Sequence, residues 1–388
     1  MENFSFKYSE SDDIISNVSF FNPDHKTQEA HLMISSKPHL DTVQSWSSIQ
    51  DELKRIEDEL NFPHPSHLFL RVFCSDVFNQ EKVLRANFPV FFDFPGKPNI
   101  SFVQQSPMPG SKLAVWAYLV KGKSPVERGE FGNIYHSNGL SHVLTANLTG
   151  DVSDNAYLQT EKMFLTYIDL LFHFKSSLLD NAIRTWVFVR DADIMYKDVA
   201  KARRMVFEKE GLNETTHYIA STGIEGKNEI PAVLSFMDTY TIAGINPGQV
   251  KFLHAPGFMC PTGTYGVTFE RGTEISYGDR KHIFISGTAS INPSGEILFP
   301  GDVVQQTYRT VENMKALLKE AGASLSDLVY ALVYVRDIAD YQIVHQTISE
   351  ILTDVPLLVL HAPICRPAWL VEIEGMAIFT IATEWPDF

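Results

Sequence analysis

Two glutamates near residue 370 have the spacing expected of a general acid and a supporting carboxylate. Charged and apolar residues alternate over 370–374 as in a β-strand, which places Glu372 and Glu374 on one face, roughly 7 Å apart. If this face is buried, each carboxylate disfavours ionisation of the other, so one stays protonated near neutral pH and can deliver a proton. From these residues alone, a solvated pair on an edge strand is the commoner arrangement.

Other reactive side chains are few. Cys365 lies seven residues before Glu372, but a lone cysteine in apolar surroundings is usually an inert core residue. The three cysteines, Cys74, Cys260 and Cys365, form no CxxC motif and no even disulfide framework, which favours a reducing cytoplasm. The sequence has no HExxH motif, no P-loop and no GxSxG elbow. We therefore expect neither a metal nor a cofactor.

The charge balance limits the classes of partner. The 388 residues include 32 Lys+Arg and 47 Asp+Glu, a formal net charge of −15. Nucleic acids and anionic membranes need clustered positive charge, so neither is an expected partner. The first residues are neither basic nor apolar, and no apolar run reaches the ~18 residues of a membrane helix. We expect a soluble cytoplasmic protein that acts on a small molecule.

The elements that must position the glutamates belong to a repeated unit. Residues 185–191 (TWVFVRD) and 331–337 (ALVYVRD) share a VxVRD core, offset by 337 − 191 = 146 residues. Each follows an amphipathic stretch and precedes a helical pattern, at 196–207 and 341–352. Both copies then contain Ile-Glu-Gly, at 224–226 and 373–375, an offset of 149. This alignment matches Glu374 with Glu225, and Glu372 with Gly223.

A weaker third copy lies upstream. The pattern predicts a helix at 48–60, a strand ending at Asp76, a short helix at 79–91 and a strand at 113–118. Ala114 and Trp116 occupy the positions of the acid pair there. We therefore divide the chain into α+β units at 1–125, 126–250 and 251–388, which bury their bare sheet faces against one another around a pseudo-threefold axis. The full acid pair in one unit predicts a single active site in one inter-unit cleft, in a monomeric pseudo-trimer.

The third unit resembles the RidA/YjgF family of small trimeric proteins, whose ligand sites lie between subunits. Its matching segments are 301–306 (GDVVQQ), 321–325 (AGASL), 335–337 (VRD) and 371–374 (VEIE). Over most of its length the chain is similar to an enlarged single-chain group of that superfamily, the chorismatases. The motifs of this resemblance are 185–186, 202–203, 220–223, 269–271, 285–291, 301–302, 365–366 and 370–375. The first ~120 residues match in element order only, and Glu270 replaces a residue that is more often small.

The resemblance implies hydrolysis of chorismate, without metal or cofactor, to pyruvate and a cyclic acid. It places the catalytic acid at Glu372, which would protonate the enol ether, while Glu374 would favour the oxocarbenium ion. Cys365 together with Gly287 is similar to the 3-hydroxybenzoate-forming subgroup. A related subgroup that also gives 4-hydroxybenzoate shares the cysteine, and a third forms a dihydrodiol, so the product stays open.

Chorismate is a dianion, so this function also requires cations in the cleft. Arg271, Arg203 and Arg366 are the candidates by position, with a solvated helix surface as the alternative for Arg203. Arg190 and Arg336 belong to the repeated VRD and are expected to be structural. Two other functions remain open: a RidA-like hydrolase of enamines or imines, and a pseudo-trimer that binds a small ligand without catalysis.

Overall fold

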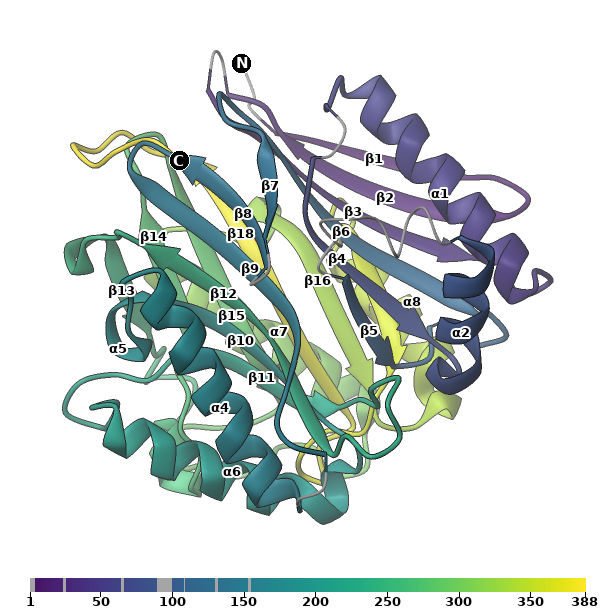
Figure 1. Cartoon of the computed structure of the whole chain (residues 1–388). Coiled ribbons are helices and arrows are strands. Elements are labelled where there is room, and N and C mark those ends of the chain that lie inside the picture. Colours follow the sequence, from purple (N-terminus) through teal and green to yellow (C-terminus); the bar gives the residue numbers. More distant parts are fainter. Residues whose placement is uncertain are drawn as a thin grey trace.

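The structure is a computed structural model, and it describes residues 4–23, 26–63, 66–88, 100–107, 109–129, 132–152 and 155–388. Its strands form three six-stranded sheets of one topology (Figure 1). None of the helices in these ranges is long and apolar enough to cross a membrane.

The three sheets follow one another along the chain. The N-terminal sheet, in the order β1-β2-β3-β6-β4-β5, consists of β1 (Phe4–Glu10), β2 (Ile14–Phe21), β3 (Gln28–Ser36), β4 (His67–Cys74), β5 (Ile100–Gln104) and β6 (Leu113–Lys121). The middle sheet, in the order β7-β8-β9-β12-β10-β11, consists of β7 (Val126–Gly129), β8 (Gly132–Ser137), β9 (Leu140–Thr149), β10 (Ala182–Val189), β11 (Ala220–Glu225) and β12 (Ser235–Ala243). The C-terminal sheet, in the order β13-β14-β15-β18-β16-β17, consists of β13 (Val250–Leu253), β14 (Gly272–Ser276), β15 (Arg280–Ala289), β16 (Leu328–Val335), β17 (Leu357–His361) and β18 (Val371–Thr380). In each sheet one edge strand is parallel to its neighbour, as β11 is to β10.

Helices cover the outer face of each sheet. They are α1 (Thr42–Glu59), α2 (Val77–Asn87), α4 (Ala156–His173), α5 (Leu178–Asn181), α6 (Ala192–Lys209), α7 (Val303–Glu320) and α8 (Tyr341–Ile351). The long helices α1, α4 and α7 start after Asp41, Asn155 and Asp302, each of which accepts a hydrogen bond from a backbone N–H of the first turn. The helices predicted at 48–60, 79–91, 196–207 and 341–352 correspond to α1, α2, α6 and α8, although residues 89–91 lie outside the described residues.

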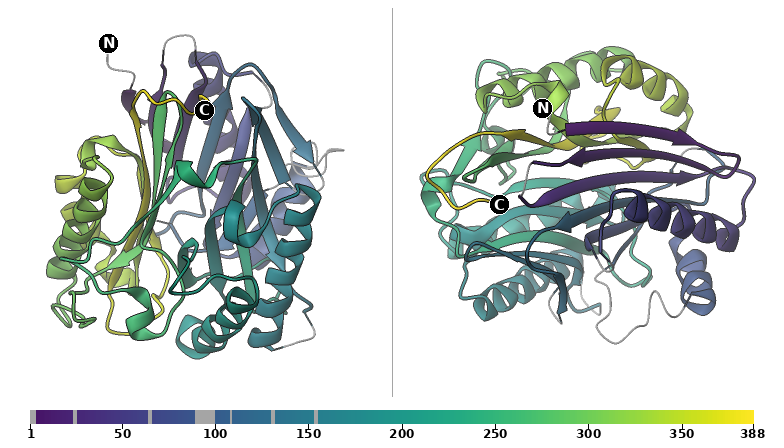
Figure 2. Two further views of the ribbon diagram at one scale, coloured as in Figure 1. Left: turned by 90° about the vertical axis from the view of Figure 1, so that its left-hand side faces the viewer. Right: turned by 90° about the horizontal axis from the view of Figure 1, so that it is seen from above.

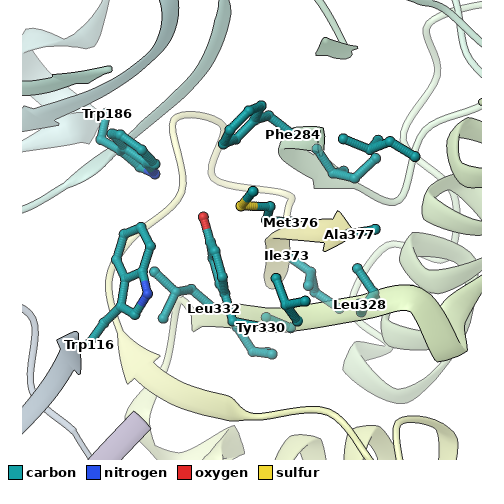
Figure 3. Packing of buried hydrophobic residues seen from close by; sticks show 14 of the residues in the cluster. Trp116, Trp186, Phe284, Leu328, Tyr330, Leu332, Ile373, Met376 and Ala377 are labelled. Atoms are coloured by element: carbon teal, nitrogen blue, oxygen red, sulfur yellow. The ribbon is translucent and has the colours of Figure 1, made fainter. Parts of the chain in front are cut away.

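The sheets face inward and the helices lie outside, as Figure 2 shows from two directions. One aromatic side chain from each sheet meets near the centre: Trp116 of β6, Trp186 of β10 and Tyr330 of β16 (Figure 3). The ring of Trp116 lies 4.5 Å from that of Tyr330 and 5.7 Å from that of Trp186, measured between centroids. The expected α+β pseudo-trimer, with its sheet faces buried against one another, is confirmed.

Each pair of units is also joined by a fully buried ion pair. Arg71 and Asp238 join the N-terminal and middle units at 2.7 Å, Arg184 and Glu374 join the middle and C-terminal units at 2.6 Å, and Glu29 and Arg280 join the N- and C-terminal units at 2.6 Å. Removing one partner of such a pair strands a charge in the interior. These contacts therefore fix how the three units sit together.

The alignment of the middle and C-terminal units by their Ile-Glu-Gly segments is wrong. Residues 224–226 lie at the end of the parallel edge strand β11, whereas β18 is an antiparallel strand next to β16. The counterpart of β18 is β12: Asp238 lies opposite Trp186 on β10, as Glu374 lies opposite Leu332 on β16. Glu374 therefore corresponds to Asp238 (374 − 238 = 136), and Glu372 corresponds to Phe236. The two Ile-Glu-Gly segments coincide by chance, but only the C-terminal unit still carries two glutamates on this strand.

Candidate active site

The two glutamates lie on β18 in the interior of the molecule. Glu372 is 4% exposed and Glu374 is completely buried, which excludes the solvated edge-strand interpretation. β18 lies between β15 and β16, where Glu372 pairs with Ala289 on one side and Tyr334 on the other. The middle unit covers this face, because β11 runs beside β15 through hydrogen bonds such as Ser221 N to Ser286 Oγ, 2.9 Å.

Glu374 is surrounded by hydrogen-bond donors. Arg184 Nη2 donates to its carboxylate at 2.6 Å, Trp186 Nε1 at 2.9 Å and the Tyr334 hydroxyl at 3.2 Å, and the Thr222 hydroxyl is a fourth donor. Three of these donors come from the middle unit. A carboxylate matched by a guanidinium and three neutral donors is the arrangement that makes a buried charge tolerable.

Glu372 is in a different environment, although it lies only two residues away. It lines a cavity, and no hydrogen bond to it is found among the described residues. Burial and the neighbouring charge of Glu374 raise its pKa to about 8, against the opposing effects of Arg184 and Arg271. A carboxyl group with this pKa is mostly protonated at neutral pH and can act as an acid toward a molecule in the cavity.

Gly287 provides the surface against which this acid rests. A Cβ atom at residue 287 would lie 2.3 Å from Oε1 of Glu372 and 2.9 Å from its Cδ. The Gly287 N–H donates to the Thr222 hydroxyl at 2.9 Å, and that hydroxyl also bonds Glu374. The pairing of β15 with β18 is irregular between Ile285 and Thr288, so Gly287 lies where the ladder is distorted.

The cavity has a volume of about 870 Å³ and lies between the middle and C-terminal units. Its walls come from β11 and α6 on one side, and from β15, β18 and the segments 265–271 and 365–369 on the other. Six of the seven residues predicted from the sequence line it: Arg203, Arg271, Gly287, Cys365, Arg366 and Glu372. The seventh, Glu374, lies two residues further along β18, is not part of the cavity wall and is bonded to the donors described above.

Four arginines line the cavity, and three of them are the ones predicted from the sequence. Arg203 is 2% exposed, so it is not the solvated helix residue of the alternative interpretation. Its Nε and Nη2 have no hydrogen-bond partner within the described parts of the chain, and the same holds for Nε of Arg271. Arg366 stacks over Tyr265 and Trp369, with 4.4 and 5.0 Å between its Cζ and the ring centroids. Buried N–H groups without partners are suited to binding the oxygens of an anion.

Cys365 is half-buried in the cavity wall. Burial, reinforced by the charge of Glu372, raises the pKa of its thiol to about 12. The group is therefore a neutral thiol at physiological pH and not an activated nucleophile.

The arginines of the repeated VRD do not line the cavity. Arg336 donates to both carboxylate oxygens of Asp193 at 3.0 and 2.8 Å, which joins the C-terminal unit to the start of α6. Arg190 donates to the carbonyl of Pro231 within its own unit. Among the described residues, no three His, Cys, Asp or Glu side chains gather in a way that could hold a metal ion.

Sequence reasoning missed several residues that build the site. Arg184 and Thr222 fix Glu374, and Tyr196 lines the cavity opposite Cys365. Thr222 lies in segment 220–223, one of the motifs of the resemblance. The sequence therefore pointed to this segment, but not to the hydrogen bond that Thr222 makes with Glu374. Arg184 and Tyr196 had no signal, because their importance depends on how two units pack.

The similarity to known protein families covers only part of the chain. The family model described as Endoribonuclease L-PSP matches residues 275–379, within the C-terminal unit. A RutC family protein of Pyrococcus abyssi is 43% identical over 68 residues, which are 18% of this chain and 54% of that protein. The 2-iminobutanoate/2-iminopropanoate deaminase of Escherichia coli is 34% identical over 73 residues, 19% of this chain and 56% of that enzyme. The chain spans 54%, 65% and 59% of the RutC relatives from P. abyssi, Pyrococcus horikoshii and Saccharolobus solfataricus.

One similar structure extends well beyond a single unit. The crystal structure of a chorismatase superposes with a TM-score of 0.61 and 19% sequence identity, covering 81% of this chain and 95% of that one. The chain has the fold of a RidA/YjgF-like pseudo-trimer. At this identity the likeness establishes the architecture, and the chemistry must be argued from the cavity itself.

Proposed function

We propose that the protein cleaves chorismate to pyruvate and 3-hydroxybenzoate, with Glu372 as the general acid. The observation that carries this proposal is the pairing of Glu372, whose pKa is about 8, with Glu374 and its donors at the wall of a cavity that the three predicted arginines line. An enol ether is cleaved after protonation of its terminal carbon, which requires an acid that is still protonated at the working pH.

In the first step Glu372 transfers its proton to the terminal methylene carbon of the enolpyruvyl group. The electrons of the C=C bond form the new C–H bond, and an oxocarbenium ion develops at the ether carbon. The carboxylate of Glu372 and the charge of Glu374 behind it both favour that cation. The Arg184–Glu374 pair is already formed, so no large reorganisation accompanies the step.

The intermediate then has two fates. In the first, the ring hydroxyl attacks the ring carbon that bears the ether, the bond from that carbon to the ether oxygen breaks so that its electrons complete the release of pyruvate, and the hydroxyl proton passes to Glu372. The resulting epoxide opens as the attacked carbon loses its proton and the oxygen gains one, which gives 3-hydroxybenzoate. The two products together contain all the atoms of chorismate. Capture of water instead adds one water molecule and gives the dihydrodiol. The resemblance of Gly287 and Cys365 to the 3-hydroxybenzoate-forming subgroup supports the first fate.

The cations of the cavity fit a substrate with two carboxylates. Arg203 and Arg271 offer buried N–H groups without partners, and Arg366 is held over two aromatic rings. In a chain of net charge −15, this cluster produces a local field that a dianion requires. We assign Arg203, Arg271 and Arg366 to the carboxylates.

A second candidate is hydrolysis of a small enamine or imine. It is favoured by the relatives of the chain, which include an enzyme named 3-aminoacrylate deaminase RutC in Acinetobacter baylyi, 27% identical over 97 residues. A protonated carboxyl group in a cationic cavity is also suited to protonating an enamine carbon.

The two candidates are separated by product analysis. The protein is incubated with chorismate, pyruvate is measured with lactate dehydrogenase and NADH, and the aromatic product is identified by chromatography. We expect pyruvate and 3-hydroxybenzoate in equal amounts. In parallel, ammonia release is followed from 2-iminopropanoate generated in situ. If ammonia is released faster than in the blank and no pyruvate forms from chorismate, the second function replaces the first. If the protein accelerates neither reaction, the remaining function is binding of a small ligand without catalysis.

A further inference from the structure

One wall of the cavity is built from alternating aromatic and guanidinium groups. The Cζ atom of Arg271 lies 5.5 Å from the ring centroid of Phe269 and 5.3 Å from that of Tyr265. The Cζ atom of Arg366 lies 4.4 Å from the centroid of the same Tyr265 ring and 5.0 Å from that of Trp369. All five side chains line the cavity. The ring of Tyr265 is therefore shared by both guanidinium groups.

The backbone and a neighbouring ring hold Tyr265 in this place. It is the last residue of a short 3-10 helix, Thr262–Tyr265. Arg204 of α6 donates a hydrogen bond to the carbonyl of the next residue, Gly266, which ties this segment to the middle unit. The ring of Trp369 meets that of Tyr265 edge-on, with 6.3 Å between centroids and 81° between planes. The Tyr265 ring is thus fixed from several sides before any ligand binds.

The stacking limits the directions from which each arginine can bind an anion. The N–H groups of a guanidinium point outward in its plane, and an aromatic ring over its face leaves only those edges for hydrogen bonds. Arg271 Nη2 donates to the carbonyl of Cys260 at 2.9 Å, and its Nε has no partner within the described ranges. Arg366 Nη2 reaches the carbonyl of Tyr265 at 3.4 Å. The remaining in-plane N–H groups can each bind one anionic group per arginine.

We propose that Tyr265 is a positioning residue that makes the cavity selective for a ligand with two carboxylates. For chorismate as that ligand, the proposal rests on the proposed function. Two guanidinium charges beside one ring repel each other, and the negative face of the shared ring offsets part of this repulsion. A dicarboxylate neutralises both charges, whereas a monocarboxylate leaves one of them unpaired. Without the ring the two arginines can move apart, and their spacing no longer matches a dicarboxylate.

The first test measures binding without turnover. The affinities of wild type, Tyr265→Leu and Tyr265→Phe for isophthalate, a rigid aromatic dicarboxylate, and for benzoate are determined by titration calorimetry at pH 7. Wild type should bind isophthalate roughly tenfold more tightly than benzoate, and Tyr265→Leu should lose most of this preference. Tyr265→Phe should keep the preference because it keeps the ring. Tyr308→Leu, at an exposed tyrosine of α7 outside the cavity wall, is the matched control and should bind both probes as wild type does.

Three results of this titration would overturn the proposal. They are a wild type without the preference, an equal preference in wild type and Tyr265→Leu, and a loss in Tyr265→Phe as large as that in Tyr265→Leu. Each variant is first checked for folding by thermal melting. If Tyr265→Leu is unfolded, Tyr265→Gln, which also lacks a ring, takes its place with the same expected result.

The second test uses pyruvate release from chorismate. Tyr265→Leu should raise KM roughly tenfold and change kcat less than about threefold, because the arginines bind the substrate whereas Glu372 supplies the proton. A lower kcat with an unchanged KM would overturn the positioning role. If wild type releases no pyruvate but prefers isophthalate in a way that depends on Tyr265, the proposed function fails and the dicarboxylate selectivity stands. Normal pyruvate release without that preference overturns the role of Tyr265 alone.

Discussion

Replacing Glu374 by Gln tests whether the buried carboxylate pair sets the acidity of the catalytic group. The change keeps the size of the side chain but removes its charge. The charge of Glu374 raises the pKa of Glu372, and the charge of Arg184 lowers it. In Glu374→Gln the repulsion from the Glu374 charge is lost, and the positive charge of Arg184 is no longer balanced by a carboxylate. Both consequences lower the pKa of Glu372.

The size of the shift follows from the geometry. Carboxylates two residues apart on one strand face are separated by roughly 7 Å, and at an effective dielectric constant of about 20 their repulsion is about 2.4 kcal/mol, or about 1.7 pKa units. The pKa of Glu372 would fall from about 8 to about 6.3. At pH 7 the protonated fraction would fall from about 90% to about 17%, which predicts a roughly fivefold slower reaction.

The assay is the rate of pyruvate release at saturating chorismate, from pH 5.5 to 9.5, measured on quenched samples. Wild type should lose activity above about pH 8, tenfold for each further pH unit. In Glu374→Gln this alkaline limb should lie more than one pH unit lower. Glu225→Gln, at a half-buried glutamate outside the cavity, is the control and should leave the profile in place. A folded Glu374→Gln protein whose alkaline limb is unmoved, or moved upward, would refute the reasoning.

Three further substitutions test the site and the fold. Gly287→Ala places a Cβ atom 2.3 Å from Oε1 of Glu372, so we expect a folded protein whose carboxyl group is displaced and whose pyruvate release is slowed roughly tenfold; an unchanged rate would contradict this. Arg203→Gln removes charge-assisted hydrogen bonds and should raise KM for chorismate roughly tenfold or more with little change in Tm, and an unaltered KM would exclude Arg203 from binding. Arg71→Met strands the buried charge of Asp238 and should lower the free energy of unfolding by about 3–5 kcal/mol in urea titration. Adding Asp238→Asn should recover part of that loss, and no recovery would argue against the ion pair as the cause.

Much of the architecture could be predicted from the sequence, because repetition is visible in it. The VxVRD strands, the helices that follow them and the separation of the units all leave local patterns. The register between units was harder to predict. Ile-Glu-Gly recurs at 224–226, but the strand that ends there is parallel to β10 and is not the counterpart of β18. Three identical residues cannot distinguish an edge strand from a central strand. The pairing of Trp186 with Asp238 does so, because it identifies β12 as the central strand that corresponds to β18.

The candidate site was predicted only as far as single elements allow. Alternation along one strand placed Glu372 and Glu374 on the same face, and the structure adds that this face is buried. Burial could not be derived from the sequence, because it depends on the middle unit covering β18 with Arg184 and Thr222. For the same reason, nothing in the sequence distinguished a buried Arg203 from a solvated one.

The most direct measurement for the central claim is the rate of pyruvate release from chorismate at pH 7 by wild type, Glu372→Gln and Glu225→Gln, each checked for folding by thermal melting. Glutamine keeps the size of the acid but has no proton to give to carbon. The account predicts that Glu372→Gln loses roughly 10²–10⁴-fold in kcat while Glu225→Gln remains close to wild type. A folded Glu372→Gln protein that releases pyruvate within about threefold of the wild-type rate would contradict the account.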